Sequence, residues 1–246
     1  MKISVVTAVF NRRDTIGQAI ASVYAQDHDD IEHIIQDGGS TDGTLDIVRT
    51  HATERTDLVS EPDKGIYDAI NRGICRATGD VVGVMHSDDF FASDDVLSKV
   101  ASAFEDPTVD GVYGDLHYVA AHDTSRVLRR WESGSYDRSK LRWGWMPPHP
   151  TFYMRRHYFE ELGLYDTELR IASDYDAMLR YFVKGRIRLE YIPEVMVCMR
   201  AGGASNGSLR RILCKSREDY TAIRRNNIGG IGTLAAKNLS KINQFL

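Results

Sequence analysis

Two adjacent acids, Asp88 and Asp89, are the residues whose type and position most clearly suggest chemistry. They follow an apolar run in segment 81–91, VVGVMHSDDFF, which is typical of a buried strand ending on a polar turn. Two ionised carboxylates side by side repel each other, and desolvating them near an apolar core is costly. Such a pair suits Mg²⁺ or Mn²⁺, because both ions prefer hard oxygen ligands. The alternative is a solvated cap of the next helix, which either acid or Ser93 could provide.

The segment DGGSTDGT at residues 37–44 is the second candidate site. Its glycines would let a flat ligand approach the backbone closely, and Asp37 would accept a hydrogen bond from that ligand. Gly and Asp also make plain turns and helix caps. The segment alone leaves both interpretations open, because short motifs often match by chance.

Three later segments carry further candidates. In IASDYDAMLRYF, Asp174 and Asp176 precede an apolar helical stripe, where acids also favour the positive end of the helix dipole. His149 stands in HPTFYMRR and could equally be a packing residue at the rim of a cleft. Gly202 and Gly203 could form a plain turn. Each of these segments, taken alone, is explained without a catalytic role.

The N-terminal part of the chain alternates between expected strands and helices. Strands are expected at 3–9, 31–36, 57–60 and from 81, and helices at 14–24, around 45–48 and at 66–77. This alternation predicts a parallel sheet covered by helices on both faces. Open sheets of this kind bind ligands at the carboxyl ends of their strands. Since acids occur in three of the four loops that follow these strands, we expect a ligand site along that edge.

The pattern loosens in the second half. Helices are expected at 96–104, 155–162 and 173–183, and strands at 111–119 and 188–199. The aromatic, proline-rich segment 136–150 is interpreted as the rim of a cleft, and 201–207 as a flexible loop.

Composition narrows the class of protein. The 246 residues carry a net charge of −4 with a pI near 6.1, which argues against a general nucleic-acid binder. Three cysteines without metal-site spacing suit a reducing compartment. No stretch approaches the roughly 20 apolar residues of a membrane helix. We therefore expect a cytoplasmic protein, with peripheral contact with the inner face of the cell membrane left open.

Taken together, these segments resemble the family 2 glycosyltransferases, which have the nucleotide-diphospho-sugar-binding GT-A fold. The resemblance spans roughly residues 3–205 and is most specific over the first 95; bacterial transferases of exopolysaccharide, capsule or lipopolysaccharide synthesis are the most similar. The segments that carry it, in order, are ISVVTAVFNR, DGGSTDGT, SEPDKGIYDAINRGICRATGD, HSDD, HPTFYMRR, SDYDAMLR and AGGAS.

The resemblance implies an α/β fold of GT-A type, with a mostly parallel central sheet and helices on both faces. It implies a glycosyltransferase domain at 1–208, in which 1–95 bind the nucleotide-sugar and 96–208 the acceptor. Asp37 is then the partner of the nucleotide base, and Asp174 the catalytic base. Asp88 and Asp89 take the metal and diphosphate position, with Mn²⁺ or Mg²⁺ as cofactor. The implied nucleotide-sugar site comprises Thr7, Val9, Asn11, Asp37, Gly38, Asp63, Lys64, Asp88 and Asp89, and the implied acceptor and diphosphate loop comprises His149, Arg200, Gly202 and Gly203.

Two residues depart from the family pattern. His86 replaces the first acid of the metal motif, so the metal would depend on Asp88 and Asp89. Ser173 replaces the usual Glu beside the base, Asp174. The implied reaction is a single displacement that inverts the anomeric carbon, with a UDP-sugar as the favoured donor and a glycan or polyprenyl-linked acceptor.

Two other classes of protein remain open. A nucleotidyltransferase would normally have a glycine-rich phosphate loop after the first strand, but the loop here, AVFNRRDT, contains no glycine. A catalytically silent sugar-nucleotide-binding module would explain the departures at His86 and Ser173.

Residues 209–246 form a basic amphipathic C-terminal extension. It contains eight Lys and Arg residues against two acids, Glu218 and Asp219. One interpretation is a helix that packs on the catalytic domain or on a second subunit. The other is a surface that lies on anionic lipid, with apolar anchors that include Leu209, Ile212 and Leu213.

Overall fold

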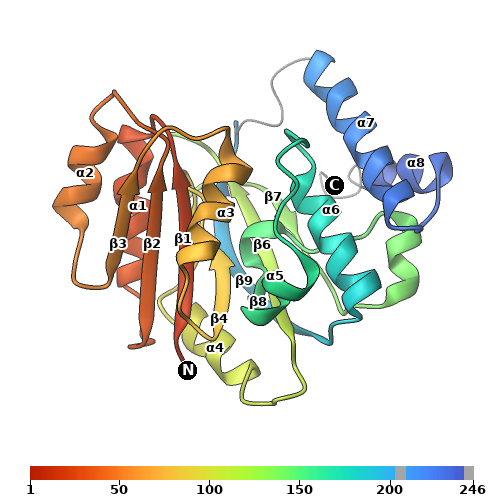
Figure 1. The fold of residues 1–246 in the computed structure, drawn as a ribbon, viewed down its shortest axis with the longest axis horizontal. Helices are drawn as coiled ribbons and strands as arrows, with labels where there is room; N and C mark the ends of the chain where they lie inside the picture. Colours follow the sequence, from red (N-terminus) through yellow and green to blue (C-terminus); the bar gives the residue numbers. More distant parts are fainter. Residues whose placement is uncertain (203–208, 241–246) are drawn as a thin grey trace.

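Four parallel strands and three helices form the first half of the protein, as the alternating pattern predicts. The structure is a computed structural model that describes residues 1–202 and 209–240. The strands lie in the order β3-β2-β1-β4 (Figure 1). The elements are β1 (Ile3–Val9), α1 (Arg13–Tyr24), β2 (Ile31–Asp37), α2 (Thr44–His51), β3 (Thr56–Ser60), α3 (Ile66–Arg76) and β4 (Val81–Val84).

The second half extends the same sheet with antiparallel and parallel pairs, in the order β4-β8-β6-β9-β5, with β7 beside β6. The sheet as a whole is therefore mixed, and its parallel character belongs chiefly to the first half. The elements are β5 (Phe90–Phe91), α4 (Val96–Ala103), β6 (Gly111–Val119), β7 (Val127–Trp131), η1 (Arg138–Trp143), η2 (His149–Thr151), β8 (Tyr153–Arg155), α5 (His157–Leu162), α6 (Ser173–Arg180), η3 (Tyr181–Gly185) and β9 (Leu189–Arg200).

Two short strands differ from the expected pattern. The helix expected at 155–162 begins only at His157, because residues 153–155 form β8 between β4 and β6. The apolar segment after the acidic turn is a separate strand, β5, in which Phe90 pairs with Cys198 of β9. Strands of two or three residues show no periodicity, so only the pairing partners reveal them.

The strand register aligns the loops that carry the candidate residues. Val9 at the end of β1 pairs with Asp37 of β2, and Asp37 pairs with Ser60 at the end of β3. On the other side of β1, Val6 pairs with Val84, the last residue of β4. The loops after all four strands therefore leave the sheet at one edge, as expected for parallel strands.

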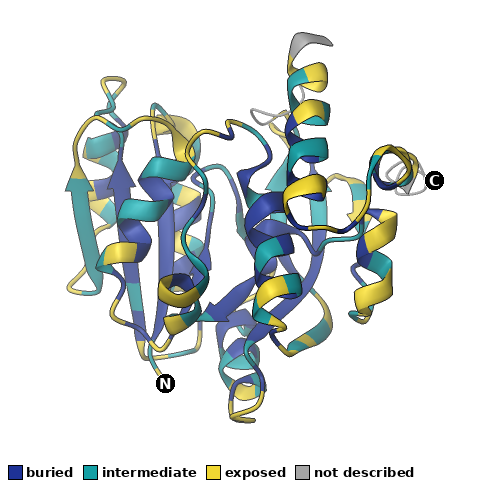
Figure 2. Ribbon diagram, turned by 45° about the vertical axis from the view of Figure 1, so that its right-hand side comes forward, coloured by how far each residue is buried: buried dark blue, intermediate teal, exposed yellow. Residues whose placement is uncertain are grey.

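Helices cover both faces of the sheet, and alternate strand residues point to opposite sides. Val6 packs in a cluster with α3, α5 and α6, whereas its neighbour Val5 packs in a cluster with α4. A third cluster joins α1 and α2 to β1 and β2. Figure 2 shows the buried strands between more exposed helices.

The C-terminal helices α7 (Leu209–Arg225) and α8 (Ile231–Ser240) pack on the rest of the α/β fold. Helix α7 lies against α6, and α8 lies against α7 and η1. Ala222 and Ile223 of α7 are fully buried in the cluster that contains α3 and α6. The extension thus contributes to the same core as the first half. Within residues 1–202 and 209–240, no helix has the length and apolar character needed to span a membrane.

Candidate active site

Asp37 ends β2 as a fully buried carboxylate with one oxygen fixed and one oxygen unused. Its Oδ2 accepts hydrogen bonds from the backbone N–H of Gly39 and of Ser40, both at 3.0 Å, and from the Ser60 hydroxyl at 2.7 Å. Its Oδ1 is buried and has no hydrogen-bond partner among the described residues. Because a buried acceptor without a partner is costly, Oδ1 is well suited to accept an N–H from a ligand.

The loops after β1, β2 and β3 converge around Asp37. Asn11 has a left-handed backbone (φ 51°), and its Oδ1 accepts the N–H of Thr41 at 2.9 Å. Gly38 lies so close to Asp63 that a Cβ at this position would collide with the Asp63 carboxylate. Lys64 follows with an exposed side chain. These predicted donor-site residues are thus brought together at the edge of the sheet.

Two residues of the predicted donor site lie beneath it. Thr7 is fully buried, and its hydroxyl is 2.9 Å from Nε2 of His33 inside the sheet. Val9 is 3% exposed and packs against α1 and α2. Their side chains support the site from the core, and a direct contact with a ligand stays a prediction.

The acidic turn between β4 and β5 is held by Arg200 at the end of β9. The backbone N–H of Arg200 donates to Oδ1 of Asp89 at 3.1 Å, and its guanidinium donates to the carbonyl oxygen of Asp88 and to the side chain of Gln18. The guanidinium also lies 5.1 Å from the ring centroid of Phe90. The pairing of β5 with β9 therefore brings Arg200 to an acid more than a hundred residues away.

Burial and the neighbouring charge of Asp88 raise the pKa of Asp89 well above its usual value. The Arg200 N–H and guanidinium oppose this shift. A bound cation would stabilise the ionised form of this carboxylate pair, because it offsets both desolvation and like-charge repulsion.

The donor chemistry of the turn fits a divalent cation that keeps other ligands of its own. Asp88 and Asp89 supply hard carboxylate oxygens, and Mg²⁺ commonly binds to one or two carboxylates together with substrate phosphates and water. Within the described part of the chain, no three His, Cys, Asp or Glu residues form a group able to hold a metal by themselves. His86 instead packs against His149, with ring centroids 5.5 Å apart.

Asp174 lies half-buried in the first turn of α6. Its Oδ1 accepts the N–H of Tyr175 at 2.8 Å and a long hydrogen bond of 3.4 Å from the Tyr67 hydroxyl. Tyr67, from α3, also donates to the carbonyl of Ile171 at 2.9 Å. Burial, followed by the charge of Asp174, raises the pKa of Tyr67 far above its usual value, so this phenol stays a proton donor.

A chain of aromatic side chains joins Asp174 to the acidic turn. Tyr67 stacks on Tyr165 at 5.9 Å between centroids, and the Tyr165 hydroxyl is 2.8 Å from Nε2 of His149. His149 in turn contacts His86. Burial lowers the pKa of His86, while the charges of Asp88 and Asp174 both oppose that change. The two acids therefore act on the same side chain and lie around one site.

Sequence patterns did not single out Tyr67, Tyr165 or Tyr118. Burial raises the pKa of Tyr118 on β6. The charge of Arg129 opposes this shift, and the charges of Asp89 and Asp174 add to it. Tyrosines occur throughout the sequence, so their type alone carries no signal.

The loop after β9 continues to Gly202, whose φ of 105° favours glycine. Gly203, predicted for the same loop, lies outside the described residues.

The family model for glycosyl transferase family 2 matches residues 4–180 of this chain. The chain belongs to this family. Among its relatives, a PGL/p-HBAD biosynthesis glycosyltransferase of Mycobacterium tuberculosis is 32% identical over 208 residues, which cover 82% of this chain and 78% of the relative. Family membership confirms the expected resemblance and favours a glycosyltransferase over a nucleotidyltransferase.

Solved structures confirm the GT-A-like α/β fold of this glycosyltransferase. Mannosyltransferase PcManGT from Pyrobaculum calidifontis, in complex with GDP-Man and Mn²⁺, has a TM-score of 0.71 at 21% identity and covers 99% of this chain and 72% of its own. S. aureus TarS in complex with UDP-GlcNAc has a TM-score of 0.70 at 17% identity, over 93% of this chain and 66% of its own.

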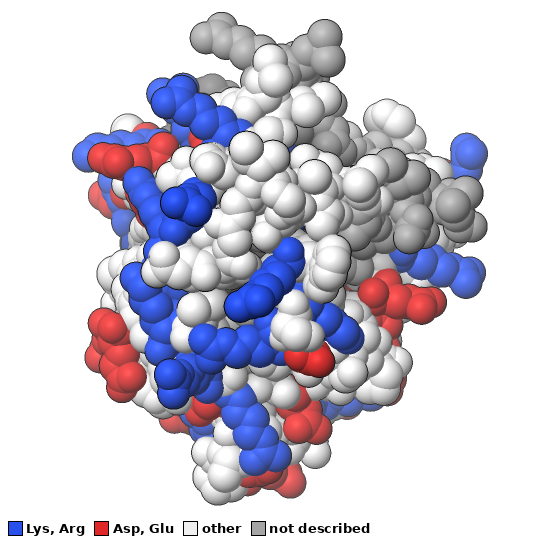
Figure 3. Space-filling view, turned by 90° about the vertical axis from the view of Figure 1, so that its right-hand side faces the viewer, with Lys and Arg blue, Asp and Glu red and all other residues white. Residues whose placement is uncertain are grey.

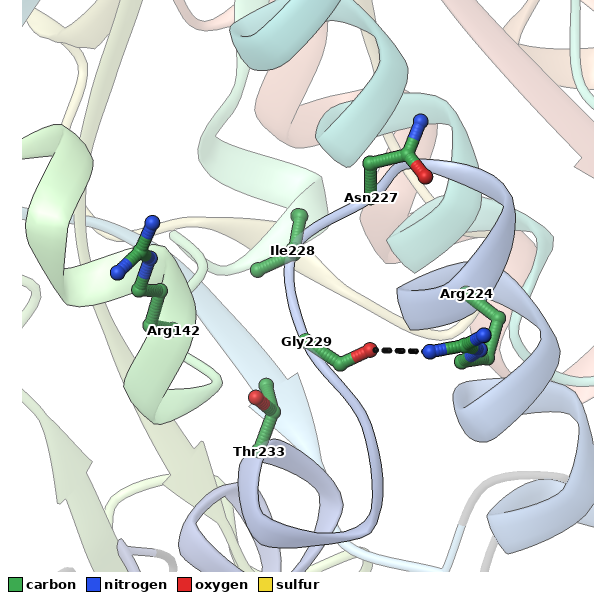
Figure 4. A pocket seen from close by; sticks show the side chains of 6 residues that line it. All are labelled: Arg142, Arg224, Asn227, Ile228, Gly229 and Thr233. Carbon is green, nitrogen blue, oxygen red and sulfur yellow. Dashed lines mark hydrogen bonds between the residues drawn. The ribbon is translucent and has the colours of Figure 1, made fainter.

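The glycosyltransferase also has a basic pocket away from the strand edge, between η1, α7 and α8. Its volume is about 520 Å³. Figure 4 shows Arg142 and Arg224 on opposite sides of it, and Arg224 donates to the carbonyl of Gly229 at 3.5 Å. The residues that line it are Arg142, Arg224, Asn227, Ile228, Gly229 and Thr233.

Proposed function

We propose that this glycosyltransferase moves a sugar from a nucleotide-diphospho-sugar to a hydroxyl group of a glycan or polyprenyl-linked acceptor, with inversion at the anomeric carbon. The observation that carries the proposal is the arrangement of three acidic sites. Asp37 ends β2 with Oδ1 available to a nucleotide base, Asp88 and Asp89 follow β4, and the charges of Asp88 and Asp174 both act on His86.

Donor recognition depends on Asp37. Its buried Oδ1 would accept the N–H of a nucleotide base, while the three bonds to Oδ2 keep the carboxylate in place. We favour a UDP-sugar, because uracil presents one such N–H at its pairing edge. The complex of TarS with UDP-GlcNAc supports this preference, although the complex of PcManGT carries GDP-Man.

Asp88 and Asp89 would hold Mn²⁺ or Mg²⁺ beside the diphosphate. When bound, the cation neutralises the negative charge that develops on the departing nucleoside diphosphate. The Mn²⁺ in the PcManGT complex supports this assignment. Arg200 at the end of β9 would hold the turn in place, because it donates to the Asp89 carboxylate and to the carbonyl oxygen of Asp88. Calorimetry of UDP binding tests the assignment: wild-type affinity that is equal with and without Mn²⁺ would contradict it.

Asp174 would act as the general base. Its hydrogen bonds from Tyr175 and Tyr67 both go to Oδ1, which leaves Oδ2 for the acceptor hydroxyl. As the acceptor oxygen forms its bond to the anomeric carbon, the bond from that carbon to the phosphate oxygen breaks, and the hydroxyl proton moves to Asp174. Attack from the face opposite the leaving group inverts the configuration in one step, without a covalent enzyme intermediate.

Turnover of a donor panel tests the proposed activity. The panel contains UDP-glucose, UDP-galactose, UDP-GlcNAc and GDP-mannose, each with Mn²⁺, and the measurement is release of nucleoside diphosphate. We expect the wild type to release nucleotide from at least one donor and Asp174→Asn to release far less. Binding of a donor without any release by the wild type would instead indicate a silent binding module.

We also propose a role in bacterial surface polysaccharide synthesis, with the extension lying on the inner face of the cell membrane. Figure 3 shows several Lys and Arg side chains on the face that carries α7 and α8, with Asp and Glu side chains beside some of them. Large apolar side chains are exposed on these two helices: Ile212, Leu213, Ile231 and Leu239. Exposed apolar groups beside basic charges are typical of surfaces that bind anionic lipid.

One basic residue of the predicted lipid-binding surface is placed differently by the structure. Lys237 is 2% exposed and pairs with Asp219 at 2.6 Å, so its charge does not belong to the surface. Removing the whole extension would also strip Ala222 and Ile223 from the core. Point substitutions are therefore the better test of lipid binding.

Flotation with vesicles of phosphatidylcholine and phosphatidylglycerol makes that test. We expect the wild type to float, high salt to reduce flotation, and the double substitution Leu213→Ser with Ile231→Ser to abolish it. Flotation that ignores both salt and the substitutions would contradict the membrane proposal without affecting the proposed chemistry.

A further inference from the structure

A carboxylate of the C-terminal extension binds the backbone directly ahead of the proposed base. Glu218 on α7 accepts three N–H groups: Arg170 through Oε1 at 3.1 Å, and Ile171 and Ala172 through Oε2 at 2.8 and 2.9 Å. The Glu218 side chain is buried. Hydrogen bonds to an ionised acceptor are stronger than neutral ones, so this contact holds the segment firmly. Asp174 lies two residues after Ala172, the last of these three.

The contact with Glu218 lies at the start of helix α6. The N-cap residue of this helix is Ala172, whose side chain makes no capping hydrogen bond. Alanine is a poor N-cap, and the first N–H groups of any helix need partners from outside it. Glu218, 46 residues further along the chain, accepts the N–H of this N-cap residue, and its negative charge also suits the positive end of α6.

The residues that follow Asp174 are held by the same two C-terminal helices. Lys237 of α8 lies 3.0 Å from the ring centroid of Tyr175 and pairs with Asp219 of α7. Asn226 at the end of α7 donates to Oδ1 of Asp176 at 3.1 Å. The chain on both sides of Asp174 is therefore fixed by α7 and α8, whereas Asp174 itself is left to face the site.

We propose that Glu218 is a positioning residue for sugar transfer, which sets the place of the Asp174 carboxylate by binding the backbone of residues 170–172. This inference rests on the proposed role of Asp174 as the base. A base must lie within hydrogen-bond reach of the acceptor, and a displacement of about 1 Å costs on the order of 100-fold in rate. On this proposal α7 acts on sugar transfer through one residue, Glu218, and through no contact of its own with the substrates.

The test compares Glu218→Ala, Glu218→Gln, Asp174→Asn and the double variant Asp174→Asn with Glu218→Ala. Thr221→Ala is the matched control on α7, because among the described residues the Thr221 hydroxyl bonds only to the carbonyl of Arg217 in its own helix. Turnover is followed with a radiolabelled donor that the wild type uses, and calorimetry measures UDP affinity with Mn²⁺. Thermal unfolding checks that each variant is folded.

We expect Glu218→Ala to lower kcat by about 10- to 100-fold while UDP affinity stays within about twofold, because only the base is displaced. Glu218→Gln keeps one acceptor oxygen and falls between Ala and the wild type. The double variant should turn over no more slowly than Asp174→Asn alone, since Glu218 acts through Asp174. Thr221→Ala should match the wild type.

Three results would overturn the inference. The first is wild-type kcat in a folded Glu218→Ala, or in Glu218→Gln if the alanine variant does not fold. The second is a double variant slower than Asp174→Asn by the full factor of Glu218→Ala, because Glu218 would then act independently of Asp174. The third is wild-type turnover by Asp174→Asn, which identifies the base assignment itself as the failure; loss of turnover in Asp174→Asn with normal Glu218 variants rejects only the positioning role.

Discussion

Asp37 at the end of β2 and Asp174 in the first turn of α6 are both proposed site residues, but the protein holds them in contrasting ways. Three groups bond to Asp37, and they come from its own loop and from the neighbouring strand β3. The turn that carries Asp174 is held by Glu218 on α7, and Tyr67 on α3 reaches across to Asp174. The proposed donor half of the site is therefore locally built, whereas the proposed catalytic half depends on elements distant in the chain.

Substitutions in the two halves should therefore affect different steps of the proposed reaction. We expect substitutions on α7 and α8 to alter catalysis and leave nucleotide affinity unchanged, because the described residues of those helices contact the segment around Asp174. Substitutions in loop 37–44 should alter nucleotide affinity and leave the base in place. The first two predictions below separate the two halves by measurements that respond to only one of them, and the last two test the seam between the halves and a response that both should share.

The largest effect is expected for Asp174→Asn, which keeps the shape of the side chain but removes the base. We expect kcat to fall by about 10²- to 10⁴-fold, the usual range for general-base catalysis, with UDP affinity near the wild-type value. Steady-state turnover and calorimetry check the two values. Glu161→Gln, an exposed neutralisation in the same half, serves as the charge control; a similar loss of rate in that variant would break the comparison.

Asp37→Ala should have the opposite pattern, in which UDP affinity falls and the proposed base stays in place. Loss of a hydrogen bond to a charged acceptor is worth about 1.5–3 kcal/mol, so UDP affinity should fall by about 10- to 100-fold. Ser60→Ala removes only one of the three bonds to Oδ2 and should have a smaller effect. Unchanged calorimetric affinity for UDP in Asp37→Ala would remove the assignment of Asp37 as the partner of the base.

Gly83→Ala tests the seam between the two halves. Gly83 of β4 pairs with Tyr153 of β8, and a Cβ at Gly83 would overlap the Tyr153 ring. Overpacking of this kind lowers the free energy of unfolding by about 1–3 kcal/mol, which denaturant titration measures. Gly232→Ala, where a Cβ meets open space, is the control. Equal stability of the two variants would mean that the seam adapts without cost.

Acid should lower the free energy of unfolding through one buried histidine in each half, and each contribution should be smaller than the effects above. Burial lowers the pKa of His33 in the first half and of His149 in the second, each to about 3. The unfolded chain therefore binds more protons below pH 6.5, so stability falls as pH decreases through that value. Each histidine should cost about 1 kcal/mol between pH 7 and pH 5.5.

Unfolding titrations of His33→Gln and His149→Gln at both pH values check this expectation, because each variant should lose one of the two contributions. A pH dependence that is unchanged in both variants would show that other groups govern the acid response.

Local patterns in the sequence predict the first half of the fold correctly and select the candidate residues in its loops. The strands at 3–9 and 31–37 follow from apolar runs, and the order of the loops follows from the rule that parallel strands share one edge. The expected nearness of loops 37–44 and 61–65 is confirmed by the contact of Gly38 with Asp63. The catalytic and ligand roles of these residues stay predictions.

The second half was less accessible to pattern analysis. Strand β8 has three residues and β5 has two, so neither has a period to detect. Lys237 was counted with the surface charges of a basic helix, but the packing of α8 against η1 and α7 buries it beside Asp219. Burial lowers its pKa to about 8, whereas the charge of Asp219 opposes that shift.

By itself, the sequence determined where acids stand relative to strand ends, because strand periodicity and turn chemistry involve residues that are close in the chain. Only the tertiary structure decided which groups hold those acids. Oδ1 of Asp37 is left without a protein partner by the packing of three loops, and Glu218 reaches residues 170–172 because α7 packs against α6. Contacts between residues far apart in sequence depend on the packing of whole helices and strands, and no local pattern encodes that packing.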